Sequence, residues 1–201
     1  REGIDGITMR KLAQCVGCTA PALYRHYEGK EEVIRDVVSE AYRQFTQYLY
    51  RALEGQSPAE RFVMAGRSYM DFAVEQPALY ELIYLPRDVL GFPGEVHSPV
   101  ADQACAIGQF WSDRVREMMD AGFLVEADPF DVSMTLWAHG HGMISIYHRG
   151  LLPVASQEEF RELMTESFLR LIRGMGTERY AEIHRELQRA VSPESPEAQP
   201  A

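Results

Sequence analysis

The sequence predicts an all-α protein in which a small N-terminal helix-turn-helix domain precedes a larger C-terminal helical bundle. Apolar residues recur at spacings of three and four along most of the chain, which is the period of an amphipathic helix, and no segment shows the alternation typical of a strand. Capping residues and prolines mark where helices begin and end. With 201 residues, 46% of them hydrophobic, the chain is long enough to bury a substantial core.

The first two expected helices are short and are separated by Gly17, and the second is expected to run from Thr19 to Tyr27. Thr8 can cap the first helix and Thr19 the second, and the glycine permits a positive φ at the tight turn between them. Leu12 and Leu23 would face inward, one from each helix. Two helices joined in this way form a helix-turn-helix, in which the second helix lies in the DNA major groove and the first braces it across the backbone.

The C-terminal part shows equally clear boundaries. Ser57 and Glu60 form a capping box, and Ser156 and Glu159 form another. Prolines and glycines between residues 86 and 99 predict a loop long enough to suggest a functional role. The expected helices run from the first capping box to residue 76, then over 78–85, 99–121, 129–149 and 160–173, with a shorter helix around 180–187 and a disordered tail over 192–201.

The net charge of −10 argues against a protein that grips nucleic acid along its whole surface. Residues 1–30 nevertheless carry five basic and three acidic residues, a net charge of +2, which leaves −12 for the remainder. Only this first segment could approach a phosphate backbone without strong repulsion. Three cysteines are too few for a disulfide scaffold, and we find no secretory signal and no apolar run of roughly 20 residues, so we expect a cytoplasmic protein without membrane contact.

The stretch TMRKLAQCVGCTAPALYRHYEGKEEV, which begins at Thr8, resembles the DNA-binding domain of the tetracycline-repressor (TetR) family of bacterial regulators. The resemblance covers residues 3–38. It rests on the lead-in Gly-Ile-Thr-Met-Arg-Lys-Leu-Ala, the glycine turn, the sequence Leu-Tyr-Arg-His-Tyr, and a lysine that opens the next long helix. It implies a helix-turn-helix DNA-binding domain over 1–38, a linking helix to about residue 54, and a ligand-binding and dimerisation domain over 55–191.

The resemblance also implies DNA contacts of two kinds. Hydroxyl and amide groups at helix N-termini suit phosphate oxygens, arginine can form two hydrogen bonds with guanine, and alanine lets a helix sit deep in the groove. Tyr24 could instead be a core aromatic; we favour the DNA contact for Tyr24 and the core for Tyr27. The residues implied for phosphates are Thr8, Thr19, Tyr24 and Lys30, and those implied for bases or groove walls are Arg10, Ala20, Ala22, Arg25 and His26.

The family places a further helix ahead of this unit, and here only residues 1–7 could belong to its end. Without that helix the inner faces of Leu12 and Leu23 would be partly uncovered. We therefore expect the natural protein to have an N-terminal extension of about one helix, and we expect the present chain to bind DNA poorly without it.

Trp137, His141 and Gly142 resemble the Trp-x-x-x-His-Gly signature of one C-terminal subtype of the family. The family resemblance implies that the two final long helices of each subunit form a four-helix dimer interface, with an apolar ligand cavity alongside. Gly140 and Gly142 would each cost about 1 kcal/mol in a helix relative to alanine, which suggests that neighbouring helices approach closely there.

Aromatic and methionine side chains are abundant in the C-terminal helices. We expect several of them to line a cavity for a small, largely apolar effector, with a histidine as its polar handle. The alternative is that they simply fill the core. The candidates are Tyr69, Tyr80, Tyr84, Phe110, Trp111, Met118, Met134, Trp137, His141 and Tyr147.

Two other patterns leave chemical alternatives open. Cys15 and Cys18 have redox or zinc spacing, but no second pair accompanies them and they straddle the predicted turn. His139, His141 and His148 could suggest a metal, yet the first two point to different sides of a helix and the last two lie two turns apart. We therefore expect no metal and no cofactor.

These observations predict a ligand-responsive transcriptional regulator, and more specifically a repressor. It would bind a double-stranded DNA operator as a homodimer and leave it when a small effector binds. The alternative is an all-α thiol oxidoreductase that uses Cys15 and Cys18, and a helical adaptor without DNA affinity is a third possibility. We favour the regulator because basic and hydroxyl residues cluster at the predicted turn.

Overall fold

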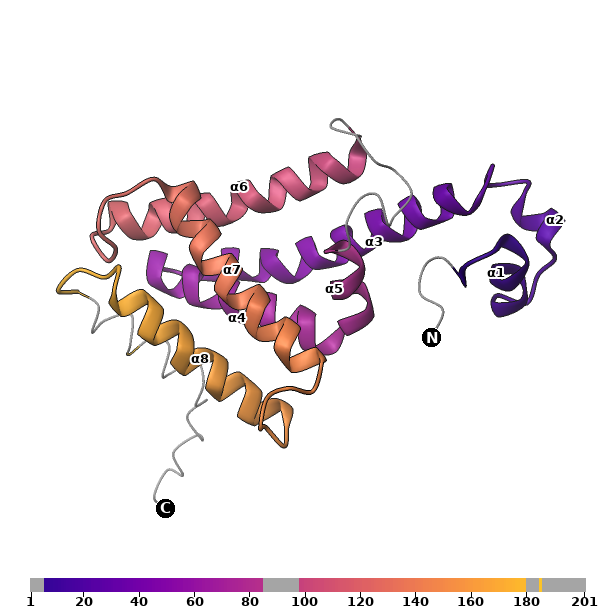
Figure 1. The fold of residues 1–201 in the computed structure, drawn as a ribbon. Coiled ribbons are helices and arrows are strands. Elements are labelled where there is room, and N and C mark those ends of the chain that lie inside the picture. Colours follow the sequence, from indigo (N-terminus) through magenta and orange to yellow (C-terminus); the bar gives the residue numbers. More distant parts are fainter. Residues whose placement is uncertain (1–5, 85–97, 180–184, 186–201) are drawn as a thin grey trace, which may run out of the picture. The chain divides into compact units, whose positions relative to one another are not determined.

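The computed structural model describes residues 6–84, 98–179 and 185, and its regular elements there are helices apart from one isolated β-bridge. The predicted all-α fold is confirmed. Most of the loop expected before residue 99, the helix expected around 180–187 (except residue 185) and the expected tail lie outside the described residues. The helices are α1 (Met9–Cys15), α2 (Ala20–Leu23), α3 (Lys30–Tyr50), the 3-10 helix η2 (Arg51–Glu54), α4 (Pro58–Glu75), α5 (Pro77–Ile83), α6 (Pro99–Asp120), α7 (Pro129–His148) and α8 (Gln157–Arg173) (Figure 1).

The two capping boxes predicted in the C-terminal part are confirmed, although the last of the described helices begins at Gln157 rather than at residue 160. The Ser57 hydroxyl accepts the amide N–H of Glu60 at 3.1 Å, and the Glu60 carboxylate accepts the amide N–H of Gln56 at 2.7 Å. The same arrangement opens α8, where Ser156 accepts the amide N–H of Glu159. In both helices the glutamate carboxylate accepts the amide N–H of the residue before the cap. These bonds satisfy amides that the first helical turn leaves unpaired.

Gly122 ends α6, as expected, with a φ of 73°. The chain then pairs briefly with the segment that follows α8: Val125 donates its amide N–H to Met175 O at 2.9 Å, and Thr177 donates to Phe123 O at 3.0 Å. These bonds fasten the end of α8 to the turn after α6.

The chain divides into two compact units, and two of the boundaries between them fall inside the long helices α3 and α6. Unit 1 comprises residues 1–44 and 78–105, and its buried cluster joins α3 to the start of α6 through Ile34, Val38 and Val100. Unit 1 therefore contains most of α5 as well as the helix-turn-helix, although the sequence grouped α5 with the C-terminal part.

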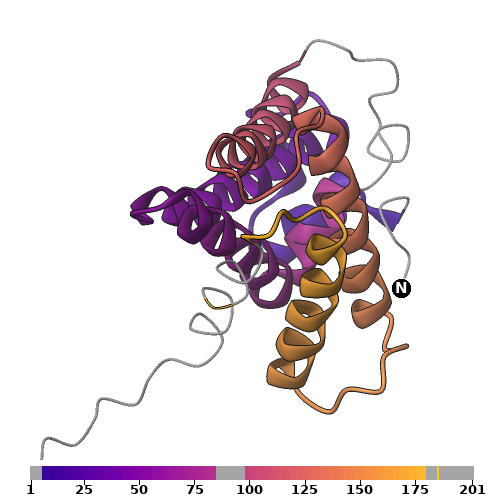
Figure 2. The same cartoon turned by 90° about the vertical axis from the view of Figure 1, so that its left-hand side faces the viewer.

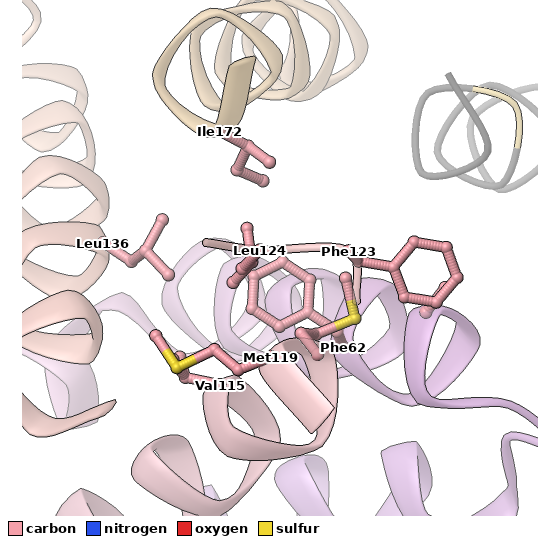
Figure 3. Packing of buried hydrophobic residues seen from close by; sticks show 9 residues of the cluster. Phe62, Val115, Met119, Phe123, Leu124, Leu136 and Ile172 are labelled. Atoms are coloured by element: carbon pink, nitrogen blue, oxygen red, sulfur yellow. The ribbon is translucent and has the colours of Figure 1, made fainter. Parts of the chain in front are cut away.

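Unit 2 comprises residues 45–77 and 106–201 and holds a larger core. Figure 3 shows side chains from several elements converging there: Phe62 from α4, Val115 from α6, Leu136 from α7 and Ile172 from α8. Each of these side chains is less than 10% exposed. Because the four residues are far apart in the sequence, this core fixes the arrangement of the four helices.

Helices α7 and α8 lie side by side in unit 2 and run antiparallel (Figures 1 and 2). Gly140 makes this approach possible, since a Cβ atom there would lie 3.1 Å from Phe168 Cζ and 3.4 Å from Tyr69 Cε1. The close packing predicted at Gly140 is confirmed. The same prediction is wrong for Gly142 within this chain, because a Cβ atom there would meet nothing within 4 Å among the described residues. Among the described residues, no helix is both long enough and apolar enough to cross a membrane.

Candidate functional site

The helix-turn-helix of unit 1 is built around Gly17, whose φ is 71°. The Thr8 hydroxyl caps α1 by accepting an amide N–H at 3.3 Å, as expected. At the other end of α1, Gly17 donates its amide N–H to Gln14 O at 3.3 Å and Cys18 donates to Ala13 O at 2.9 Å. This pair of bonds is the Schellman motif, which requires a residue with positive φ at its centre. The predicted glycine turn is therefore confirmed.

The second helix is shorter than predicted. We expected it to continue to Tyr27, but regular α-helix stops four residues after it begins. From there Arg25 donates its amide N–H to Ala22 O at 3.4 Å, and the next amide makes the same i to i−3 bond at 2.9 Å. Such bonds tighten the last turn into a 3-10 geometry. Thr19 occupies the N-cap position in an extended conformation, but its hydroxyl makes no capping hydrogen bond, contrary to our expectation.

The side chains predicted to contact DNA reach solvent to different degrees. Tyr24 is 57% exposed, which does not fit the alternative that it is a core aromatic. Ala20, Ala22 and Lys30 are half-buried. The remaining predicted contacts are exposed, namely Thr8, Arg10, Thr19, Arg25 and His26.

Tyr27 behaves differently from Tyr24. It is half-buried, and a hydrogen bond to Asp36 together with the negative charge of that carboxylate raises the pKa of the Tyr27 phenol. Because Asp36 belongs to α3, the bond ties the end of the helix-turn-helix to the following helix. This geometry supports the interpretation of Tyr27 as a packing residue.

Unit 2 contains a cavity of about 70 Å³ between four of its helices. Three of its lining residues, Phe62, Leu136 and Ile172, also belong to the core shown in Figure 3. The lining is almost entirely hydrocarbon and aromatic, which suits an apolar ligand. It consists of Phe62, Val63, Gly66, Arg67, Tyr69 and Met70 from α4, Trp111 from α6, Leu136 and Trp137 from α7, and Met164, Thr165, Phe168 and Ile172 from α8.

Three of the predicted ligand-binding residues line this cavity: Tyr69, Trp111 and Trp137. The rings of Tyr69 and Trp111 meet edge to face, with centroids 6.0 Å apart. His141, the predicted polar handle, stacks on Trp137 at a centroid distance of 5.4 Å but does not itself line the cavity. Phe110 packs against Trp111 from outside the lining.

The other predicted ligand-binding residues also lie outside this lining. Met118 is fully buried in the core, and Met134 is 40% exposed. Tyr147 stacks on a phenylalanine of α8 at a centroid distance of 3.9 Å. Tyr80 and Tyr84 belong to unit 1, where their rings pack on each other with centroids 4.8 Å apart.

Arg67 and the lining residues of α8 carry no sequence signal that marks them as ligand-binding. Met164, Phe168 and Ile172 follow one another at a spacing of four, which is the ordinary pattern of a buried helix face. Gly66 is informative in another way, because a Cβ atom there would meet nothing within 4 Å. This glycine leaves room in the cavity wall rather than permitting close helix packing.

Two histidines of α7 have a lowered pKa. Burial lowers the pKa of both His139 and His141, and the positive charges of Arg170 and Arg149, respectively, lower it further. Both imidazoles are therefore neutral at neutral pH. His148 contacts a backbone carbonyl oxygen of α4, at 3.0 Å from its Nε2. Among the described residues no three potential ligands gather in a metal-binding arrangement, and all three cysteines are exposed thiols.

Comparison with known families explains the combination of these two sites. A model of bacterial regulatory proteins of the TetR family matches residues 1–37. A model described as the tetracyclin repressor-like C-terminal domain matches residues 62–168, which is more than half of the chain. The chain belongs to the tetracycline-repressor family. The first match covers the helix-turn-helix, and the second covers the cavity lining except Ile172.

Membership of the TetR family makes the protein a ligand-responsive, DNA-binding transcriptional regulator and not an enzyme. The alternative of a thiol oxidoreductase, which the spacing of Cys15 and Cys18 had left open, is therefore wrong. The helical adaptor without DNA affinity is wrong for the same reason.

Solved structures show the same fold. A protein with unknown function from Rhodococcus sp. RHA1 is 22% identical, with a TM-score of 0.71 over 88% of this chain and 89% of that one. A TetR family transcriptional regulator, PfmR from Thermus thermophilus, is 19% identical, with a TM-score of 0.62 over 81% and 88%. AibR in complex with isovaleryl coenzyme A and operator DNA is 16% identical, with a TM-score of 0.64 over 81% and 88%. No curated protein matches the chain.

Proposed function

We propose that the protein is a repressor that binds its operator as a homodimer and leaves it when a small, largely apolar effector fills the cavity of unit 2. The observation that carries this proposal is the presence, in one TetR-family chain, of an exposed helix-turn-helix and an apolar cavity between four other helices. AibR has the same fold and has been seen with both a coenzyme A thioester and operator DNA, which supports an effector that acts on DNA binding.

The DNA-reading residues proposed are those predicted from the sequence. Arg25 would pair with a guanine, Tyr24 would hold a phosphate, and the half-buried Ala22 would let the second helix sit deep in the groove. We propose that the DNA-binding domain ends near residue 38 and that α3 carries the chain to a ligand-binding and dimerisation domain that starts near residue 55. The cytoplasm, where the operator lies, is the proposed location.

The dimer interface is proposed on the outer face of α7. Phe130 is 57% exposed and Met134 is 40% exposed, and Ala138 and His141 continue the same stripe at helical spacing. Residues 132–147 contain no lysine, arginine, aspartate or glutamate, so this face carries no full charge at neutral pH. The open space above Gly142 would let a second helix approach closely. Exposed apolar faces of this kind typically mark protein interfaces.

The effector would act by a population shift. A dimer whose two reading heads exchange between DNA-competent and incompetent separations needs only a few kcal/mol of differential affinity to be switched by a ligand. Filling the cavity changes the packing of α4, α6, α7 and α8, and packed cores respond to such changes by discrete rearrangement.

Selection of DNA duplexes from a random library tests the repressor proposal. We expect enrichment of two inverted half-sites about one helical turn apart, and binding that Arg25→Ala weakens by about 1 to 3 kcal/mol. The matched control is Arg116→Ala, which changes an exposed arginine of α6. Recovery of no preferred sequence, or equal loss in the control, would overturn the proposal.

Sedimentation tests the dimer. We expect Met134→Glu to yield monomers, because a carboxylate would be buried without a partner in the proposed interface. Leu53→Glu, which places the same charge on a 51% exposed position of η2, should leave the dimer intact. A monomeric wild type, or a dimer that tolerates Met134→Glu, would show that this face of α7 does not pair.

A further inference from the structure

We infer that the effector is a carboxylic acid whose compact apolar body fills the cavity of unit 2 and whose carboxylate lies at Arg67. This inference rests on the proposed function, since it specifies the chemistry of a ligand for the cavity already described.

Arg67 is the only residue with a full charge in the cavity lining, and it is an exposed side chain, so it lies where the cavity meets solvent. The carboxylate best placed to neutralise it along α4 is Asp71, four residues further on. Asp71 pairs instead with Arg161 of α8. Among the described residues no carboxylate forms an ion pair with Arg67, so the apolar cavity opens beside a guanidinium that is solvated but not ion-paired.

Trp111 provides a second observation that points to a ligand. Its indole Nε1 is buried and has no hydrogen-bond acceptor among the described residues. Buried donors are almost always paired, and this one belongs to a residue that lines the cavity, so a ligand there is available to provide the missing acceptor. A ligand oxygen would supply it. The hydroxyl of Thr165, which also lines the cavity, already donates its hydrogen bond to Arg161 O at 2.8 Å and so has no O–H left for a ligand.

A carboxylic acid fits these two observations better than other ligand classes. Arg67 would repel a cation, and a neutral hydrocarbon would leave the buried indole N–H without an acceptor. A carboxylate at the exposed Arg67 keeps part of its hydration, so its desolvation cost is small, while the apolar body gains about 25 cal/mol for each Å² of surface removed from water. A cavity of about 70 Å³, widened by the missing side chain at Gly66, suits a phenyl ring or a short alkyl chain.

Acids and their uncharged amides of the same shape give a direct test. Phenylacetate is compared with phenylacetamide, and hexanoate with hexanamide. Affinities are measured by isothermal calorimetry and by tryptophan fluorescence, which is suitable because both tryptophans of the chain line the cavity. We expect each acid to bind the wild type about two- to fivefold more tightly than its amide, which is the range for an ion pair with an exposed arginine. Arg67→Gln should remove most of this preference, whereas Arg116→Gln, which changes another exposed arginine of unit 2, should retain it.

Trp111→Phe tests the second contact. It keeps an aromatic ring but removes the N–H, so it should weaken both the acid and the amide, and the acid more, because a hydrogen bond to a charged oxygen is the stronger one. Because Arg67 is exposed, its substitution should alter stability little, and thermal unfolding checks that each variant is folded.

Three results would overturn the inference: equal affinity for acid and amide in the wild type, a preference that survives Arg67→Gln, or no binding of any of the four compounds. The proposed function fails in a different way. If a ligand bound in the cavity leaves operator affinity unchanged, the protein is not released by such a ligand, whatever its charge. A neutral compound that binds and releases the operator would refute the acid and leave the repressor proposal standing.

Discussion

The candidate DNA contacts all lie between Thr8 and Lys30, and most of their side chains are exposed, whereas the cavity draws its lining from four helices spread over residues 62–172. In the helix-turn-helix, function depends on which polar side chains the local turn exposes. In the cavity it depends on what is missing, above all a side chain at Gly66 and a partner for the Trp111 indole. Substitutions at the two sites should therefore differ in their effects on DNA binding, ligand binding and stability.

The largest effect is expected from Met118→Ala. Met118 is fully buried in the core of unit 2, so its truncation should lower the free energy of unfolding by about 2 to 5 kcal/mol. Urea denaturation measures this change, and Leu151→Ala, at a 69% exposed position, should cost less than about 0.5 kcal/mol. A small stability loss combined with altered ligand affinity would return Met118 to the ligand site.

Arg25→Ala should weaken operator binding by about 1 to 3 kcal/mol while leaving the unfolding free energy unchanged, because the side chain is exposed. Fluorescence anisotropy on the selected operator gives the first quantity and urea denaturation the second. A loss of stability as large as the loss of affinity would mean that Arg25 supports the fold rather than reads DNA.

Two glycines of unit 2 should respond in opposite directions to the same substitution. Gly66→Ala should stabilise the protein by up to about 1 kcal/mol, since a Cβ there meets nothing and alanine favours the helix. Gly140→Ala should destabilise by about 1 kcal/mol or more, because its Cβ would lie 3.1 Å from Phe168. Thermal unfolding measures both, and effects of the same sign would contradict the packing described here.

The smallest effect is expected from the titration of two histidines, which makes the free energy of unfolding depend on pH. The folded protein holds the pKa of His139 and His141 below the value of 6.5 that they have when unfolded, so the unfolded chain binds more protons as the pH falls. The stability due to the neutral histidines is fully present above pH 6.5 and is lost progressively below it. Comparison of the wild type with a His139→Gln, His141→Gln double variant from pH 7.5 to 5 isolates this part. Identical slopes would show that the histidines do not contribute.

The same contrast explains how much the sequence could predict. The helix starts at Ser57 and Ser156, the positive φ at Gly17 and the different environments of Tyr24 and Tyr27 follow from local chemistry, and the structure agrees with each of them. The second helix of the reading unit ends early because the amides of Arg25 and His26 bond to i−3 carbonyls, although that of Tyr27 bonds to i−4 again. Side-chain spacing does not encode this local change.

The cavity was less predictable because helical spacing indicates which face is buried but not whether the facing side chains fill the space. Gly66 and Gly140 look alike in the sequence, yet one borders open space and the other is in tight contact. Met118 and Trp111 lie seven residues apart on α6, so sequence spacing places them on the same face. Met118 nevertheless fills the core, whereas Trp111 lines the cavity. These distinctions arise from contacts between segments that are distant in the chain.

The central claim is that a ligand in the cavity of unit 2 controls operator binding. It is tested most directly by the anisotropy of a labelled operator during titration with a ligand that quenches the tryptophans, for the wild type and for Gly66→Leu, whose added side chain would occupy the cavity. We expect the ligand to release the operator from the wild type and to leave operator binding by Gly66→Leu unchanged. Release at the same ligand concentration in both proteins would contradict the claim.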